Sequence, residues 1–310
     1  MLRAILIITI PCVLAVALAA AVGGCGAAGG GESAESERLP VVATTMPVAD
    51  FARQIGGKRV EVTGIIGPDA DPHAYEPKPS DAAAVADAEL VVSSGAGIDS
   101  WLGDLLEQAG ADAPRVEATR GIGLRPTEER GFPGDPHVWH DPELAVRMVD
   151  NVEAGLARAD PAGRADYARR ADAYRQRLGR MAARIRASFA SVPAERRDLV
   201  TSHDAFGYFA RAYDVNVVGS VLPVVTTEAE PSARQVRALI DEIRARRVRT
   251  VFTEAAVEPQ LERRVADEAG ARVSTSLYAD SLGGPGSGAE GFVEAELANA
   301  RAMRASWPDH

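Results

Sequence analysis

Short apolar runs rich in valine and isoleucine alternate with segments of helical spacing along the first part of the chain. β-branched residues at this density favour extended structure, so we predict strands over three runs: 39–45, 60–66 and 89–94. The segments between and after them predict helices: 47–56, one that Ser80 caps, and 98–109. Strands and helices that alternate in this way are typical of βαβ units and of a parallel sheet.

The middle of the chain contains two successive helix-start signals. Asp141–Pro142 and Asp160–Pro161 each place a capping carboxylate directly before a proline that suits the first helical turn. We predict that the first helix ends near residue 159 and the second near residue 191. At a rise of about 1.5 Å per residue, the second helix would be about 45 Å long. A helix of that length can connect two lobes.

The alternation of strands and helices resumes after residue 197. We predict strands over 198–203, 215–222, 248–254 and 271–277, and helices over 205–213, 232–246 and 259–269. The predicted fold class is therefore α/β, with two lobes that each contain a parallel-type sheet with flanking helices, joined by one long rigid helix. The predicted lobes cover 39–159 and 192–310, and the linker helix covers 160–191.

The first 24 residues differ from the rest. Arg3 precedes an apolar run that ends in small residues, which is the order of a secretory signal rather than of a membrane span. The sequence VGGC resembles the bacterial lipobox, which implies cleavage after residue 24 and lipidation of Cys25. An ordinary signal peptide or an uncleaved anchor is the alternative. The Gly-, Ser- and Glu-rich composition predicts a flexible tether over 25–38.

Charge and cysteine usage exclude several classes of function. The net charge of −10, from 34 basic and 44 acidic residues, argues against a nucleic-acid partner. Cys12 and Cys25 are the two cysteines of the chain, and both belong to the signal region or its end. The mature domain therefore has no disulfide, no thiolate metal ligand and no cysteine nucleophile.

Four of the five histidines fall in three short motifs. The motifs are DPHAYEP with His73, DPHVWHDP with His137 and His140, and TSHDAFGYF with His203. His73 and His203 follow the ends of predicted strands, where ligands gather in open α/β sheets. The spacing leaves two interpretations open. Either the tertiary fold assembles a shared metal site, or the histidines are unrelated and cap helices or fill polar loops.

Asp280, in the motif YADSLG, follows the last predicted strand and is a fourth candidate ligand. The alternative is a turn or helix-capping aspartate. Three imidazoles and one carboxylate would form a closed tetrahedral set with nitrogen and oxygen donors, which suits Zn²⁺.

Taken together, six motifs resemble the zinc/manganese solute-binding proteins of bacterial ABC importers: DPHAYEPKPSD, DPHVWHDPE, TSHDAFGYFA, EPSARQVRALI, VFTEAAVEP and YADSLG. Their order and spacing match that family from residue 39 to about residue 293. The resemblance implies two α/β lobes joined by a stiff helix, with the metal in the interlobe cleft. It implies four ligands: His73, His137, His203 and Asp280.

The resemblance also bears on two neighbouring residues. Glu254, in VFTEAAVEP, becomes a candidate acceptor that orients a ligand histidine, with a helix-capping role as the alternative. His140 occupies a position where the family pattern does not require histidine. We interpret it as a surface residue or as a residue that supports the ligands from outside, while a switch of ligand from His137 to His140 stays open.

We therefore predict a binding protein, not an enzyme, that captures Zn²⁺ and delivers it to an ABC transporter permease. Manganese-leaning members of the family often carry a carboxylate at the position of His203, so imidazole there favours zinc, with Mn²⁺ as the alternative. The predicted protein is a monomer outside the cytoplasmic membrane, held to it only by the lipid anchor, at the cell surface or in the periplasm. Loading by a metallochaperone stays open. A zinc-dependent hydrolase and an adhesin are the alternatives from other classes.

Overall fold

The computed structural model describes residues 38–308 except 69, 256–257 and 275. The predicted signal segment, Cys25 and nearly all of the predicted tether lie outside the described residues. The first elements form one parallel sheet, which we call the N-terminal sheet, with the strand order β2-β1-β3-β4. Its strands are β1 (Leu39–Ala43), β2 (Val60–Gly64), β3 (Leu90–Ser93) and β4 (Arg115–Glu117).

Helices cover both faces of the N-terminal sheet. They are α1 (Met46–Gly56), α2 (Pro79–Ala86), α3 (Leu102–Ala109) and α4 (Pro142–Ala159), with short 3-10 turns η1 (Gly57–Arg59) and η2 (Val138–His140). Val41 and Ala43 pack in the main core with α1 and α4, whereas Val42 packs with α2 and α3. Successive strand residues point to opposite faces, which explains why this strand is apolar at nearly every position.

The C-terminal half repeats the alternation, with two longer strands followed by two strands of two residues each. Its strands are β5 (Asp198–His203), β6 (Asn216–Leu222), β7 (Thr250–Val251) and β8 (Arg272–Val273), and its helices are α6 (Gly207–Tyr213), α7 (Ala233–Arg246), α8 (Gln260–Ala269) and α9 (Phe292–Ser306). Strands β5 and β6 pair in parallel, as do β7 and β8. The N–H of Phe252 donates to the carbonyl of Val200, which brings β7 alongside β5.

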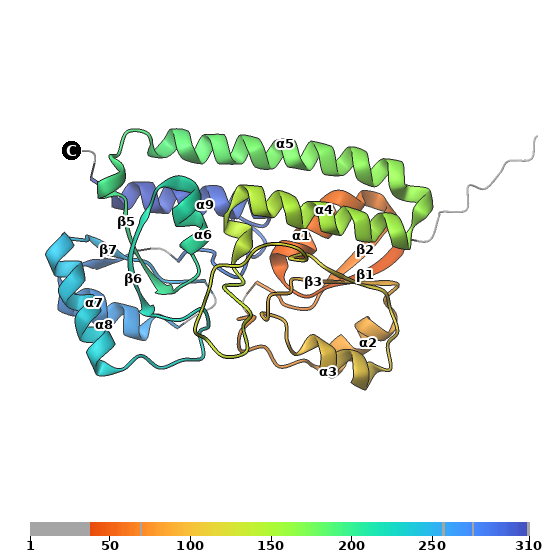
Figure 1. Cartoon of the computed structure of the whole chain (residues 1–310), viewed down its shortest axis with the longest axis horizontal. Coiled ribbons are helices and arrows are strands. Elements are labelled where there is room, and N and C mark those ends of the chain that lie inside the picture. The colour runs from red at the N-terminus through yellow and green to blue at the C-terminus, as the bar shows by residue number, and fades with distance from the viewer. Residues whose placement is uncertain (1–37, 69, 256–257, 275, 309–310) are drawn as a thin grey trace, which may run out of the picture. The chain divides into compact units, whose positions relative to one another are not determined.

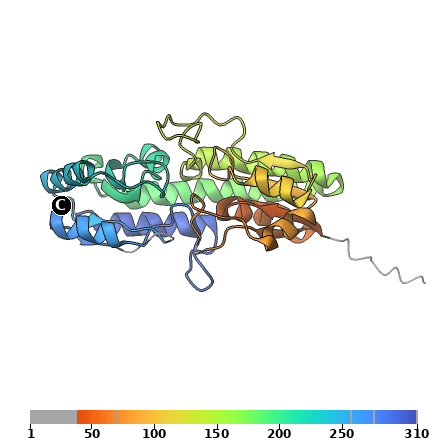
Figure 2. The ribbon, with the colours of Figure 1, turned by 90° about the horizontal axis from the view of Figure 1, so that it is seen from below.

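Helix α5 (Arg164–Phe189) runs along both halves of the chain, after the short turn η3 (Pro161–Gly163) and before η4 (Ala194–Arg196) (Figure 1 and Figure 2). In its first half, the Tyr174 hydroxyl donates to Asp50 of α1 at 3.0 Å. At its end, Phe189 packs edge-on against Trp307, with ring centroids 4.8 Å apart. One apolar stripe of α5 therefore contacts elements from both halves. Within the described residues, we find no helix whose length and apolarity would let it cross a membrane.

The predicted fold class is confirmed: the chain is α/β, with parallel strands, flanking helices and one long helix. Asp141 caps α4 by accepting the N–H of Glu143, and Asp160 accepts the N–H of Gly163, as their Asp-Pro pairs predict. The predicted boundaries of signal, tether, lobes and linker stay predictions.

Some local predictions were wrong. Ser80 does not cap α2, which begins at Pro79, and the carboxylate of Asp81 instead accepts the N–H of Lys78 at 2.7 Å. The helix predicted over 98–109 begins at Leu102, because the preceding loop folds around the buried Asp99, whose carboxylate accepts backbone N–H groups from that loop. The strands predicted over 248–254 and 271–277 shrink to two residues each.

Candidate metal centre

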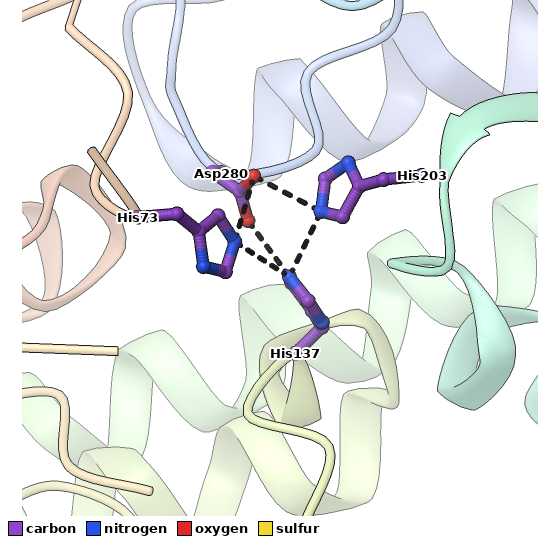
Figure 3. A group of neighbouring side chains, drawn as sticks. All are labelled: His73, His137, His203 and Asp280. Atoms are coloured by element: carbon purple, nitrogen blue, oxygen red, sulfur yellow. Dashed lines mark hydrogen bonds and ion pairs between the residues drawn. The ribbon is translucent and has the colours of Figure 1, made fainter. Parts of the chain in front are cut away.

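Four side chains converge from separate segments of the chain, and we call them the four-donor cluster: His73, His137, His203 and Asp280 (Figure 3). One ligand atom from each lies within 4.8 Å of the others. His137 Nε2 lies 3.2 Å from His203 Nε2 and 3.4 Å from His73 Nε2. The Asp280 carboxylate lies 3.1 Å from Nε2 of His137 and 3.3 Å from that of His203.

These separations suit a single tetrahedral ion. Ligands at about 2.0–2.1 Å from a zinc ion occupy the corners of a tetrahedron whose edges are about 3.3 Å. The cluster is also shielded from water. The side chains of His73, His137 and His203 are fully buried, and that of Asp280 is 6% exposed. The structure thus brings together all four candidates that the sequence analysis named.

Local structure explains how each donor reaches the cluster. His203 is the last residue of β5, and His73 lies in the loop that follows β2, so both stand beyond the carboxyl ends of parallel strands. His137 directly precedes η2, and Asp280 follows the bridge between Leu277 and Glu254. Trp139 adds a link between the last two segments, because its indole Nε1–H donates to the carbonyl of Ala279 at 3.1 Å.

Two histidines of the cluster are held by carboxylates on their outer sides. The N–H of His203 donates to Glu254 Oε1 at 3.0 Å, and its Nδ1 lies 2.6 Å from Oε2. The N–H of His137 donates to Asp135 Oδ1 at 3.0 Å, and its Nδ1 lies 2.7 Å from the same oxygen. A proton held at Nδ1 fixes the tautomer that leaves Nε2 free to bind a metal. Glu254 is thus placed as the sequence interpretation proposed.

Sequence reasoning missed Asp135, although its motif gave a signal. Asp71 and Asp135 stand two residues before His73 and His137 in the same Asp-Pro-His pattern, and each accepts the N–H of its histidine. Only Asp135 also reaches the imidazole. The second oxygen of Asp71 accepts the hydroxyl of Thr227 instead. Within the part of the chain that the structure describes, the buried Nδ1 of His73 has no hydrogen-bond partner.

His140 lies apart from the four-donor cluster. Its interpretation as a surface residue is wrong, because the residue is 1% exposed. Its Nδ1 lies 2.8 Å from Glu296 Oε1 of α9, and its ring stacks on Phe206 with centroids 4.6 Å apart. The side chain is therefore directed to Phe206, which directly precedes α6, and to α9 rather than to the point where the four donors meet.

The carboxylates and imidazoles of the cluster shift each other's pKa values toward their charged forms. Burial alone would lower the pKa of His137, but the carboxylates of Asp280 and Asp135 outweigh burial and raise this pKa to about 10. For His203, burial is likewise outweighed by Glu254 and Asp280, so its pKa is raised. Burial would raise the pKa of Asp280, yet the three surrounding histidines hold it well below its usual range. Because the pKa values of His137 and His203 are raised, a divalent cation that binds these imidazoles must displace protons from them.

We expect Glu254→Gln to weaken metal binding by about 10–100-fold, since carboxylates that hold a ligand histidine contribute that much in metal sites. The N–H and the Nδ1 of His203 engage different oxygens of Glu254, and glutamine would present an NH2 group, which cannot accept, at one of these two positions. Competition against a chromophoric chelator measures the change. Glu258→Gln, in the same motif but exposed, is the matched control. Equal affinities for the two variants would contradict the orienting role of Glu254.

Comparisons with known proteins agree with this geometry. Residues 41–306 match the model of the family described as zinc-uptake complex component A, periplasmic. The manganese-binding lipoprotein MntA of Halalkalibacterium halodurans is 32% identical, over 91% of this chain and 92% of the relative. The iron-binding protein YfeA of Yersinia pestis is 33% identical, over 80% of each chain. The solved structure of the periplasmic zinc-binding protein TroA from Treponema pallidum has a TM-score of 0.79 and 29% identity, and the match covers 87% of this chain and 99% of that one.

The fold and the four converging donors define a solute-binding protein for a metal ion. Since the family match spans most of the sequence, the chain belongs to the family of zinc-uptake complex component A. Proteins of this family are substrate-binding components of ABC metal transporters and not enzymes. The resemblance drawn from the six motifs and the prediction of a binding protein are therefore confirmed, and a hydrolase is not supported.

Proposed function

We propose that this protein captures Zn²⁺ outside the cytoplasmic membrane and delivers it to the permease of an ABC importer. One observation carries the proposal: three imidazole Nε2 atoms and the Asp280 carboxylate converge, buried, within 4.8 Å of one another. A nitrogen-rich set with one carboxylate suits zinc, whereas manganese prefers more oxygen donors. Four protein ligands close the tetrahedral shell, which leaves no position for an activated water.

The electrostatics of the cluster support capture of a divalent cation. Burial by itself would raise the pKa of Asp280. The surrounding histidines outweigh this effect and hold the pKa well below its usual range, so Asp280 stays ionised. A fixed negative charge in a water-excluded site attracts a cation more strongly than the same charge in water. Asp135 and Glu254 add negative charge directly behind two of the imidazoles.

The anchor and the partner follow from the family. Relatives such as MntA are named lipoproteins, which supports lipidation of Cys25 and a location on the outer face of the cytoplasmic membrane. The metal transporters that such proteins serve contain a membrane permease, and this permease is the partner that we infer. Electrospray mass spectrometry of protein purified from membranes should show a chain that begins at Cys25 and carries the added mass of the lipid.

Manganese is the second candidate cargo, because the relatives of this chain are named for different metals. MntA, at 32% identity, is named manganese-binding, TroA, at 31%, is named zinc-binding, and YfeA, at 33%, is named iron-binding. The cluster offers one carboxylate for an oxygen-preferring ion. The two candidates differ in the metal that the cell obtains through this protein rather than in the residues that hold it.

Two measurements separate these candidates. Protein purified without chelators should contain about one zinc ion per chain, and cells that lack the protein should recover growth in depleted medium when zinc is added. Recovery with manganese alone would favour the second candidate. Failure of the purified protein to bind zinc at micromolar concentration would contradict the first. Zinc binds more tightly than manganese to most sites of this kind, so the growth test carries more weight than competition in vitro.

A further inference from the structure

A single arginine joins the segments that carry two histidines of the four-donor cluster. Arg125 lies in the segment between β4 and η2, which is olive in Figure 1 and runs beside the C-terminal half. Its Nη1 forms an ion pair with Asp135 Oδ2 at 3.1 Å. Its Nη2 donates to Asp204 Oδ2 at 3.2 Å. The guanidinium therefore bridges two carboxylates that belong to different halves of the chain.

Each bridged carboxylate stands next to a donor of the cluster. Asp135 is fully buried, and its other oxygen holds both the N–H and the ring of His137. Asp204 directly follows His203 in the chain. A path of contacts thus leads from His137 through Asp135 and Arg125 to Asp204, the chain neighbour of His203.

The residues around the guanidinium of Arg125 fix its position. A Cβ atom on Gly207, at the start of α6, would fall 0.9 Å from Arg125 Nη1, so a side chain there would displace the guanidinium. The Tyr208 hydroxyl accepts the N–H of Arg125 at 2.7 Å and donates to the carbonyl of Asp135 at 2.9 Å. The ring of Tyr208 lies 5.7 Å from the guanidinium carbon. Arg125 is thus fixed at both its backbone and its side chain.

We propose that Arg125 is a positioning residue, which fixes the spacing of His137 and His203 by bridging the carboxylates beside them and thereby slows release of the bound metal. The proposal rests on the proposed function of the four-donor cluster as a metal site. Arginine suits this role because its planar guanidinium presents separate N–H groups to two acceptors, whereas the ammonium of lysine is a compact point charge.

The sign of the effect distinguishes positioning from simple electrostatics. Removing a positive charge near a cation site should by itself strengthen cation binding, because repulsion is lost. Removing a positioning residue should instead weaken binding, because residues that orient metal ligands contribute about 10–100-fold to affinity. Arg125→Gln therefore gives opposite results under the two explanations. Gly207→Ala offers the same test without any change of charge, since it displaces the guanidinium.

The test measures release of zinc from loaded protein into excess chelator by stopped flow. We expect release to be about tenfold faster in Arg125→Gln and Gly207→Ala, and intermediate in Arg125→Lys. Arg211→Gln is the matched control. Arg211 also pairs with an aspartate of the other half, Asp141, at 3.0 Å and also lies over the Tyr208 ring, but it does not contact Asp135.

A second measurement uses the metal-free protein. Hydrogen exchange at the backbone N–H of His137, followed by mass spectrometry, should be faster in Arg125→Gln and Gly207→Ala but unchanged in Arg211→Gln. Release at the wild-type rate together with unchanged exchange in Arg125→Gln would overturn the proposal, as would equal effects in Arg211→Gln. If the wild-type protein holds no zinc, the proposed function fails, and the exchange measurement alone then decides the role of Arg125.

Discussion

Replacing His137 with alanine is expected to abolish stable metal binding. Its Nε2 lies within 3.4 Å of one donor atom from each of the other three residues, so it stands at the centre of the cluster. Four ligands share a binding free energy of about 10–16 kcal/mol in structural zinc sites, so the loss of one costs about 2.5–4 kcal/mol. That cost corresponds to a loss of about 10²–10³-fold in affinity. Metal content after dialysis and competition with a chelator measure it.

His140→Ala is the control for this prediction, because it removes a histidine three positions away that contacts Glu296 instead. We expect full metal content and a stability loss of about 1–3 kcal/mol, since the buried carboxyl of Glu296 would lose its partner. Thermal unfolding of the metal-free protein measures that loss. Metal lost from the His140 variant and kept by the His137 variant would overturn the assignment of His137.

Acidification is expected to weaken metal binding steeply. In the metal-free protein the pKa of His137 is about 10, because Asp280 and Asp135 outweigh the effect of burial. The metal must therefore displace a proton at every pH below about 10, and displacement of one proton lowers affinity about tenfold per pH unit. Between pH 8 and pH 6 we expect a loss of about 100-fold. His203, whose pKa is also raised, adds to this slope.

The same shift affects the stability of the metal-free protein in the opposite direction. The folded pKa of His137 exceeds the unfolded value of 6.5, so its protonated form stabilises the fold fully below pH 6.5. This contribution is lost as the pH rises from 6.5 to about 10, while the stabilisation by added zinc grows over the same window.

Calorimetric titration in buffers of different ionisation enthalpy counts the protons released, and at pH 7 we expect about one or more per zinc ion. A constant affinity between pH 6 and pH 8, without proton release, would contradict the pKa assigned to His137.

The sequence predicted those elements whose signals are local. Asp141 and Asp160 each precede a proline, and this pattern predicts a helix start. In the structure, both aspartate side chains accept a backbone N–H of the turn that follows, as predicted. Helix α9 received no prediction. Its buried face includes the polar side chains of Glu296 and Asn299, which interrupt the apolar stripe that indicates a helix. Strand β4 also received no prediction, because it has only three residues, of which Val116 alone is buried.

Predictions about the site failed where distant residues decide the outcome. The aspartates of the two Asp-Pro-His motifs look equivalent, yet Thr227 engages the second oxygen of Asp71, while Asp135 keeps its carboxylate for His137. His140 is buried because Glu296, 156 positions later in the chain, reaches it from α9. The sequence around Asp71 does not contain Thr227, and the sequence around His140 does not contain Glu296. The four-donor cluster could be named in advance only because several motifs together indicated a family.

The packing of α1 against α9 limits how this protein can exchange its cargo. Phe51 packs edge-on against Phe292 with centroids 5.0 Å apart, and the N–H of Phe292 donates to Asp50. These contacts belong to the apolar core that extends along α5 through both halves. A hinge motion that separates the two halves would disrupt this core and expose its apolar side chains to water. Loading and unloading should therefore depend on small displacements of the loops around the ion, with the body of the molecule acting as a rigid frame.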